Sequence, residues 1–316
     1  MMESLLTTCS NRQESPFDLT DDRTYQRWRE WKLRDYPRTA GDLIVRIADP
    51  FQISAAEKHA LLQCCRKANA AIYQISDGNI SDKDLVSALG RQFGLKRLDR
   101  NLRADEDSIT SLQVMPDEDR TLYIPYTNRP LNWHTDGYYN TPEEQVKGVV
   151  LHCVSDAAQG GDNVYLDHEI AYILLRDENP DYISALMQPD VMTIPGNTEA
   201  GLELRPAQTG PVFSVDPGTG SLHMRYTART RSIAWKEDDL TRLAAEFLTR
   251  LLAGESAWLF RHHLKPGQGI ICNNILHKRE AFVDDAANGR IRLLYRARYF
   301  DRIQGTGLNT IWSGDR

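Results

Sequence analysis

The stretch Asn132-Trp133-His134-Thr135-Asp136 places a histidine and an aspartate two residues apart, between segments whose apolar residues favour short strands. A second histidine, His277, follows far downstream, just after the apolar run 269–276. Two imidazoles and one carboxylate are the protein ligands that hold one face of an iron(II) ion and leave the opposite face open. Arg292, which comes after His277, indicates a carboxylate-bearing cosubstrate beside that metal.

A His-x-Asp pair is weak evidence on its own, because charged residues make up about a quarter of an average chain. For His134 and Asp136 alone, a surface turn is an equally good interpretation. The context favours ligands, because Trp133 precedes the pair, Gly137 follows it, and strand-like sequence lies on both sides. The other histidines lack a partner at ligand spacing, lie in an apolar strand or lie in a polar loop: His59, His152, His168, His223, His262 and His263.

Composition limits the classes of function. The chain has 316 residues, with 38 Lys plus Arg against 44 Asp plus Glu, and a net charge of -6. An acidic chain without a basic tract is a poor candidate for binding nucleic acid or an anionic membrane surface. No run of about eighteen apolar residues appears, so no transmembrane helix is expected. The N-terminus lacks the pattern of a secretory signal, and residues 1–16 are expected to be a disordered tail.

The five cysteines are an odd number without regular spacing, which predicts neither a disulfide framework nor a structural zinc site. Cys64 and Cys65 lie in a helical pattern and are expected to pack as small apolar groups. A reducing cytoplasm is the compartment that this usage favours. Residues 17–316 are expected to form one domain, because no repeat or low-complexity linker divides them.

The chain changes character along its length. The part from 17 to about 120 is dominated by helical patterns, among them a capping box at Ser54 and Glu57 with apolar residues continuing to Ile72, and a second helix over 81–93. From about 121 to 303, short strands and turns predominate, with one late helix marked by Leu240, Leu243, Ala244, Phe247 and Leu251. Strands are expected at 146–154, 163–166, 268–273 and 292–300, and a hairpin joins 213–215 to 222–224. Helices followed by strands indicate an α+β fold.

The segment HTDGYYNTPEEQVKGVVLHCVSDAAQGGDNVYLDHEIAY, over 134–172, resembles the taurine-dioxygenase-like superfamily, and within it especially gamma-butyrobetaine hydroxylase. The later stretch LHKREAF, with RIRLLYRARYF, is similar to the segment of the same family that carries the second histidine and the arginine. Together these motifs cover about residues 122–300, and the first third is only weakly alike.

The resemblance implies a double-stranded β-helix, or jelly-roll, core with flanking and inserted helices. It also implies iron(II) bound by His134, Asp136 and His277, with 2-oxoglutarate and O2 as cosubstrates. Arg292 is expected to pair with the 5-carboxylate of 2-oxoglutarate, because a guanidinium fork fits a carboxylate in two parallel hydrogen bonds. Arg290 is the nearest competitor for that role. Where the family often has Thr or Ser as a second donor, this chain has Asn163.

The substrate is less well indicated. Gamma-butyrobetaine hydroxylases hold a trimethylammonium group in an aromatic cage, and Tyr126 stands where one cage tyrosine is expected. Leu112 and Arg298 fall near two other aromatic positions, so carnitine synthesis is not the expected function. Arg296 and Arg298, with Arg231, instead indicate a carboxylate, sulfonate or phosphonate group on the substrate. Further polar contacts are expected from Asn128, Asn132, Tyr138 and Tyr139. Solvated strand positions are the alternative for these arginines.

The expected activity is therefore an iron(II)- and 2-oxoglutarate-dependent hydroxylation of an unactivated C–H bond in a small anionic metabolite, with release of succinate and CO2. A small molecule is the expected partner, without nucleic acid or membrane, and the resemblance leaves homo-oligomerisation open. Two alternatives stay open. One is a catalytically silent β-helix protein that binds a ligand or a partner. The other is a metal-dependent hydrolase, because a facial triad can also activate water.

Overall fold

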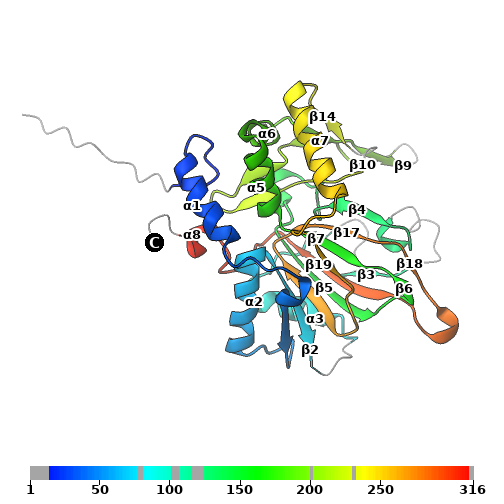
Figure 1. Cartoon of the computed structure of the whole chain (residues 1–316). Coiled ribbons are helices and arrows are strands. Elements are labelled where there is room, and N and C mark those ends of the chain that lie inside the picture. Colours follow the sequence, from blue (N-terminus) through cyan, green and yellow to red (C-terminus); the bar gives the residue numbers. More distant parts are fainter. Residues whose placement is uncertain are drawn as a thin grey trace, which may run out of the picture.

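Two β-sheets form the centre of the computed structural model, which describes residues 14–76, 81–100, 107–114, 124–199, 202–229 and 233–312. Both sheets combine strands from distant parts of the chain (Figure 1). The larger sheet has the order β1 (Ile44–Ile47), β2 (Ala70–Ile75), β16 (Gln268–Cys272), β5 (Gly148–Ser155), β19 (Leu293–Tyr299) and β3 (Thr110–Leu112). The smaller sheet has the order β15 (Phe260–His262), β7 (Asn163–Leu166), β17 (Leu276–Arg279) and β4 (Leu131–His134).

The central strands of the larger sheet are apolar on both faces because both faces are covered. Alternate residues of a strand point to opposite faces. On one face, Val150 and Ile271 pack in a cluster with residues of two helices, α2 (Ala55–Ala68) and α3 (Asp84–Gln92). On the other face, Val149 and Ile270 line a cavity that residues of the smaller sheet also line. The two sheets therefore enclose a common interior, and the expected double-stranded β-helix core with flanking helices is confirmed.

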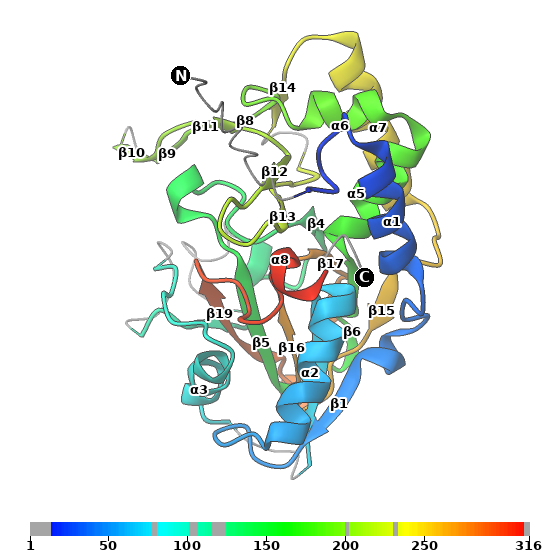
Figure 2. The ribbon, with the colours of Figure 1, turned by 90° about the vertical axis from the view of Figure 1, so that its left-hand side faces the viewer.

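Helices α2 and α3 lie along the outer face of the larger sheet (Figure 2). The capping box that begins α2 is present, because the Glu57 amide donates to Ser54 Oγ and the Ser54 amide donates to the Glu57 carboxylate. The helix ends at Ala68, and Asn69 follows in the left-handed conformation with φ 55°. Ile72 was expected to continue the helix, but it lies on β2, so that part of the prediction is wrong. Helix α3 also starts later than expected, at Asp84.

The first third of the chain is less purely helical than its pattern predicts. The strands β1, β2 and β3 all belong to the larger sheet, although they precede residue 121. Five of the six residues of β2 are buried, so this strand is a continuous apolar run without the alternation that identifies a half-buried strand. Such a run directly after a helix has the appearance of a longer helix.

Among the described residues, three inserted helices are present where one was expected. They lie together on the side of the molecule away from α2 and α3 (Figures 1 and 2). They are α5 (His168–Glu178), α6 (Pro180–Leu186) and α7 (Asp239–Ala253). Helix α5 was missed because eight of its eleven residues are buried, which removes the polar face that reveals helical periodicity. Helix α7 was expected, yet it buries Ala244, Leu248 and Leu252, whereas Leu243 is 40% exposed.

The remaining elements connect this framework. They are α1 (Asp22–Leu33), η1 (Ala40–Leu43), η2 (Ile124–Tyr126), η3 (Pro142–Glu144), β6 (Gln159–Gly160), β8 (Met192–Ile194), β9 (Asn197–Glu199), β10 (Leu202–Arg205), β11 (Gln208–Gly210), β12 (Phe213–Val215), β13 (Leu222–Met224), β14 (Ala234–Trp235), β18 (Phe282–Val283), η5 (Ala286–Asn288) and α8 (Leu308–Ile311). The expected hairpin is present as β12 and β13, which pair antiparallel.

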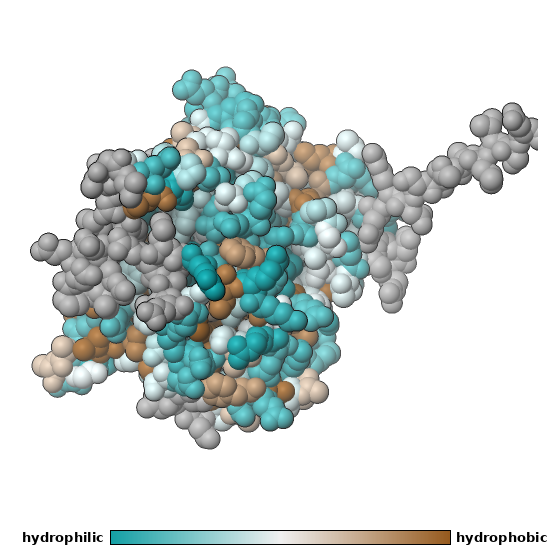
Figure 3. All heavy atoms as spheres, turned by 180° about the vertical axis from the view of Figure 1, so that it is seen from behind, coloured by the Kyte–Doolittle hydropathy of each residue, from teal (hydrophilic) through white to brown (hydrophobic). Residues whose placement is uncertain are grey.

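Several expectations fall on parts of the chain outside the described residues. These are most of the predicted tail, over 1–13, and Arg231. The segments 101–106 and 115–123, at the end of the predicted helical part and the start of the predicted strand part, also lie outside them. Within the described ranges, no helix is long and apolar enough to cross a membrane. On the face shown in Figure 3, polar residues cover most of the coloured surface, and apolar residues appear in small separate patches.

Candidate metal and cosubstrate site

The two candidate histidines lie directly opposite each other on adjacent antiparallel strands. His134 ends β4 and His277 is the second residue of β17, and their ring centroids are 4.2 Å apart. Nδ1 of each ring lies close to the backbone carbonyl two residues earlier, at 2.9 Å from Asn132 O and 3.0 Å from Ile275 O. A carbonyl oxygen can only accept, so each Nδ1 must carry the proton. Each Nε2 is therefore left with a free lone pair, as a metal ligand requires.

The third candidate ligand, Asp136, is buried and its carboxylate is only half satisfied. Oδ1 accepts a hydrogen bond of 2.9 Å from Arg296 Nη1, whereas Oδ2 is buried without a hydrogen-bond partner. One ligand atom from each of His134, Asp136 and His277 can be chosen so that all lie within 4.8 Å of one another. A buried carboxylate oxygen that has no donor is costly unless a cation fills its place.

The charge states of these groups suit a divalent cation. Burial, helped by the neighbouring His277, lowers the pKa of His134 to about 3, which keeps its imidazole neutral at physiological pH. Burial alone raises the pKa of Asp136, but Arg296, His277 and Arg298 outweigh it and bring the pKa below its ordinary value. Neutral imidazole and ionised carboxylate are the forms that bind metal. The residues present therefore fit iron(II).

A cavity between the two sheets extends from this group to Arg292. Arg292 is 4% exposed, and its Nη1 is buried without a hydrogen-bond partner. The hydroxyl of Tyr165 is likewise buried and unpartnered. Burial lowers the pKa of Arg292 to about 10, so the guanidinium stays charged at neutral pH. The cavity is lined by Leu112, Pro125, Leu131, Asp136, Val149, Leu151, Asn163, Tyr165, Ile270, Cys272, Ile275, His277, Arg279, Arg292 and Arg296.

A buried cation and a buried hydroxyl that face one cavity without partners fit an anionic ligand with acceptor oxygens. No ion pair joins Arg292 to a carboxylate among the described residues, and its guanidinium carbon instead lies 5.0 Å from the Phe282 ring centroid. Its competitor, Arg290, has a side chain 51% exposed, lies 3.9 Å from Asp156 and does not line the cavity. The residues at this end of the cavity therefore fit the 5-carboxylate of 2-oxoglutarate.

The predicted substrate residues differ in their surroundings. Arg296 lines the cavity, although one of its nitrogens already donates to Asp136. Arg298 is buried but paired, because it lies 2.5 Å from an Asp99 carboxylate oxygen and donates to the Tyr139 hydroxyl at 3.0 Å. It does not line the cavity. Of the two arginines, Arg296 is thus the one that can reach a ligand there.

The other predicted contacts lie around this site rather than in it. Tyr126 is buried in the hydrophobic core, while its neighbour Pro125 lines the cavity. The Tyr138 ring is half-buried, 6.4 Å from the His134 ring. Two further predicted contacts, Asn128 and Asn132, are exposed to solvent. The structure brings Asp136 and His277 of the metal group, with Asn163, Arg292 and Arg296, to one cavity. The other predicted contacts that the structure describes do not line it.

Three residues at the site were not predicted. Tyr165 follows Asn163 at the two-residue spacing that places both on one face of β7, and both line the cavity. Arg279 stands at the same spacing from His277 on β17 and also lines the cavity. Strand alternation was a signal that could have found both. Asn274, which hydrogen-bonds the backbone of Asp136, had no such signal because it lies in a turn.

Comparisons with known proteins agree with this geometry. The family described as "Taurine catabolism dioxygenase TauD, TfdA family" matches residues 33–298. A uridine-5'-phosphate dioxygenase from Amycolatopsis sp is 32% identical over 171 residues, and the match covers 52% of this chain and 60% of that protein. A uridine-5'-phosphate dioxygenase from Streptomyces sp is 28% identical over 206 residues, which cover 60% of this chain and 68% of that protein.

A crystal structure of a putative alpha-ketoglutarate-dependent taurine dioxygenase from Burkholderia xenovorans has the same fold. It matches with a TM-score of 0.56 and 16% identity, over 84% of this chain and 88% of that one. Both of these relatives are named for uridine 5'-phosphate, so the narrower likeness to gamma-butyrobetaine hydroxylase is not supported. Because the family match spans most of the chain and the His134, Asp136 and His277 group is in place, the chain belongs to the TauD, TfdA family of iron(II)- and 2-oxoglutarate-dependent dioxygenases.

Proposed function

We propose that this chain is a 2-oxoglutarate-dependent non-haem iron dioxygenase that hydroxylates an unactivated C–H bond of a small anionic metabolite. The observation that carries the proposal is that one cavity joins the histidine and aspartate group to the buried, unpartnered Arg292. A hydrolase that uses the metal only to activate water leaves that arginine and the Tyr165 hydroxyl without a ligand.

In this proposal, His134, His277 and Asp136 would hold iron(II), with Nε2 of each ring and Oδ2 of the carboxylate as the atoms that have no other partner among the described residues. The backbone carbonyls of Asn132 and Ile275 orient the two rings, and Arg296 keeps Oδ1 of Asp136 occupied, which leaves Oδ2 free. Iron(II) bound there with 2-oxoglutarate supplies the oxygen activation that hydroxylates the substrate and yields succinate and CO2.

The opposite end of the cavity would hold 2-oxoglutarate. Arg292 would bind the 5-carboxylate in a charge-assisted hydrogen bond, and the Tyr165 hydroxyl and the Asn163 amide would donate further bonds. The site is shielded from bulk solvent, because Arg292 is 4% exposed and Tyr165 is also 4% exposed. Hydrogen bonds made in such surroundings are stronger than in water.

Charge supports an anionic substrate. Among the described residues, those that line the cavity include three arginines, Arg279, Arg292 and Arg296, and one carboxylate, that of Asp136. Iron(II) and the 2-oxoglutarate dianion would cancel each other, which leaves the positive excess for a second anion. Because the two relatives are named for uridine 5'-phosphate, nucleoside 5'-monophosphates are the first class to test.

The test compares uridine 5'-monophosphate with uridine, which differ only in the phosphate. Iron(II)-loaded protein is incubated with 2-oxoglutarate and oxygen, and succinate and substrate oxidation are measured. We expect succinate to form much faster with the nucleotide than with the nucleoside. Equal rates with both would contradict the anionic substrate class. If 2-oxoglutarate is not consumed with any compound, the result would favour the catalytically silent protein instead.

A further inference from the structure

The turn between β16 and β17 carries two consecutive asparagines whose side chains make separate sets of contacts. Asn273 and Asn274 are 3% and 2% exposed. Asn274 has a φ of 52°, in the left-handed region that only a few residue types adopt readily. Three residues later the chain reaches His277, so this turn directly precedes one of the candidate metal ligands. A buried polar side chain on a left-handed backbone is unfavourable unless its contacts compensate, so the contacts of Asn274 decide its role.

The side chain of Asn274 makes three hydrogen bonds, two of them to the backbone of Asp136. Its Oδ1 accepts from the Asp136 amide at 2.8 Å, and its Nδ2 donates to the Asp136 carbonyl at 2.9 Å. The same Nδ2 donates to the Val146 carbonyl at 2.6 Å. Strand β4 ends at His134, so Asp136 lies beyond the ladder that would otherwise bond its peptide groups. The carboxamide, which both accepts and donates, takes the place of a neighbouring strand.

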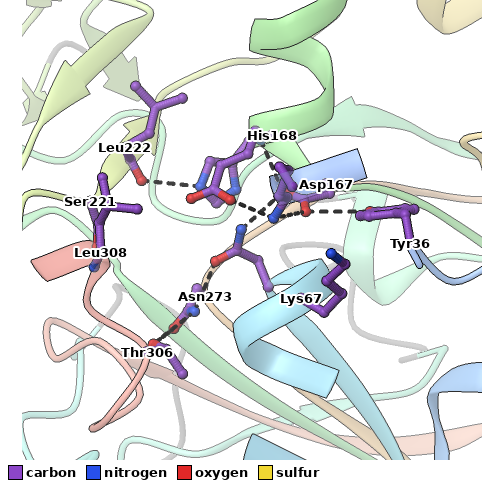
Figure 4. Close-up of polar contacts among 12 residues, drawn as sticks. Tyr36, Lys67, Asp167, His168, Ser221, Leu222, Asn273, Thr306 and Leu308 are labelled. Carbon is purple, nitrogen blue, oxygen red and sulfur yellow. Dashed lines mark hydrogen bonds and ion pairs between the residues drawn. The ribbon is translucent and has the colours of Figure 1, made fainter. Parts of the chain in front are cut away.

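The adjacent Asn273 holds the turn from the other side. Its Nδ2 donates to Asn69 Oδ1 at 3.0 Å and to Thr306 Oγ1 at 3.1 Å, and its backbone amide donates to the Asn69 carbonyl. Figure 4 shows Asn273 and Thr306 at one end of a buried polar network that continues to Asp167 and Tyr36. The turn is thus fixed to the interior of the protein on one side while Asn274 reaches Asp136 on the other.

We infer that Asn274 is a positioning residue for the metal site, which sets the place of the Asp136 carboxylate by clamping its peptide groups. The inference rests on the proposed function, because it takes Asp136 to be a metal ligand. Groups that orient a metal ligand typically change metal affinity by about 10- to 100-fold when they are removed. Asparagine suits position 274 because it tolerates the left-handed backbone and supplies both bonds to Asp136.

The experiment measures the dissociation constant for Mn(II) on metal-free protein, followed by electron paramagnetic resonance of the free ion. Asn274→Gly keeps the left-handed backbone without strain and removes only the carboxamide. Asn274→Asp keeps the acceptor for the Asp136 amide and loses the donor. We expect Mn(II) binding to weaken about 10- to 100-fold in both variants. We also expect the 2-oxoglutarate-dependent activity at saturating metal to recover further in Asn274→Asp than in Asn274→Gly.

Asn69→Gly is the matched control, because Asn69 is also buried and left-handed with φ 55°. The variant loses the side-chain bonds to Asp167 and Asn273, but it keeps the Asn69 carbonyl that accepts from the Asn273 amide and all three bonds of Asn274. It should lower the urea midpoint of unfolding and leave Mn(II) affinity within about twofold. Wild-type affinity in both Asn274 variants would overturn the inference, and so would equal weakening in Asn69→Gly or failure of both Asn274 variants to fold. If the wild-type protein binds no Mn(II), the proposed function is contradicted, and the inference that rests on it fails as well.

Discussion

Buried charged groups occur both beside α1 and in the cavity between the sheets. Beside α1, each charged group has a partner of opposite charge within the protein, whereas in the cavity some have none among the described residues. Lys32 is 0% exposed, lies 2.7 Å from Asp167 Oδ2 and also pairs with Glu169. Asp167 accepts from Asn69 and Tyr36, and Arg302 donates to Asn69 at 2.7 Å. One buried cation, Lys32, and one half-buried cation, Arg302, thus accompany two buried carboxylates. Such a network holds the surrounding elements together and has no charge left for a ligand.

The cavity shows the opposite arrangement. Asp136 Oδ2, the Tyr165 hydroxyl and Arg292 Nη1 are all buried without a partner, and the arginines outnumber the carboxylates. An uncompensated buried polar atom costs free energy, so a native fold retains several in one place only where something else satisfies them. Balance therefore distinguishes a structural network from a binding site in this molecule, although both consist of the same kinds of side chain.

The largest expected effect comes from His134→Ala. The loss of a metal ligand should weaken Mn(II) binding by more than the roughly 100-fold that removal of an orienting group produces. Stability of the metal-free protein should change far less than metal affinity, because the variant removes one hydrogen bond to the Asn132 carbonyl and the ring contacts with His277 and Tyr138. Titration with Mn(II) beside thermal unfolding in the presence of a chelator measures both. Unchanged Mn(II) affinity would show that the ligand set is elsewhere.

Lys32→Met should have the reverse effect. It leaves Asp167 and Glu169 buried without their cation, which is expected to lower the free energy of unfolding by about 3–5 kcal/mol. Mn(II) affinity of the folded fraction should stay near that of the wild type. Urea unfolding followed by fluorescence gives the first quantity. If the variant were as stable as wild type, the network would not hold the fold as its contacts indicate.

Arg292→Gln removes the unpartnered cation at the far end of the cavity. A charge-assisted hydrogen bond contributes about 1.5–3 kcal/mol, so the KM for 2-oxoglutarate should rise roughly 10- to 100-fold. Arg290→Gln is the control, because its exposed guanidinium donates to the Ala157 carbonyl outside the cavity. Succinate formation measured against 2-oxoglutarate concentration compares the two. A larger effect at Arg290 would reverse the assignment.

The smallest expected effect concerns pH. Burial raises the pKa of Asp167, but Lys32 outweighs it, and the pKa lies below its ordinary value. In the unfolded chain an aspartate titrates near 3.9, so the stability that this carboxylate adds is present above about pH 4 and is lost as the pH falls toward its folded pKa. Asp167→Asn should therefore lose less of its free energy of unfolding than wild type does between pH 5 and pH 2. Unfolding curves across that range test it, and parallel curves would contradict it.

Local spacing predicted the parts of the site that share a short segment or a strand face. His134 and Asp136 were found because they lie two residues apart, and Arg296 because it stands on an arginine-rich strand. The difference between Arg296 and Arg298 could not be predicted, since it depends on Asp99, which pairs with Arg298 from far along the chain. No local pattern singled out Lys32, for the same reason. Its partners on and before α5 become its neighbours only when the chain folds.

The most direct measurement is an anaerobic titration of the iron(II)-loaded protein with 2-oxoglutarate, recorded in the visible range. Chelation of iron(II) by 2-oxoglutarate should give a metal-to-ligand charge-transfer band that saturates at one equivalent of 2-oxoglutarate per iron. The same titration of His134→Ala should give none. A wild-type protein that is loaded with iron(II) and develops no band would contradict the central claim that this cavity binds the metal and 2-oxoglutarate together.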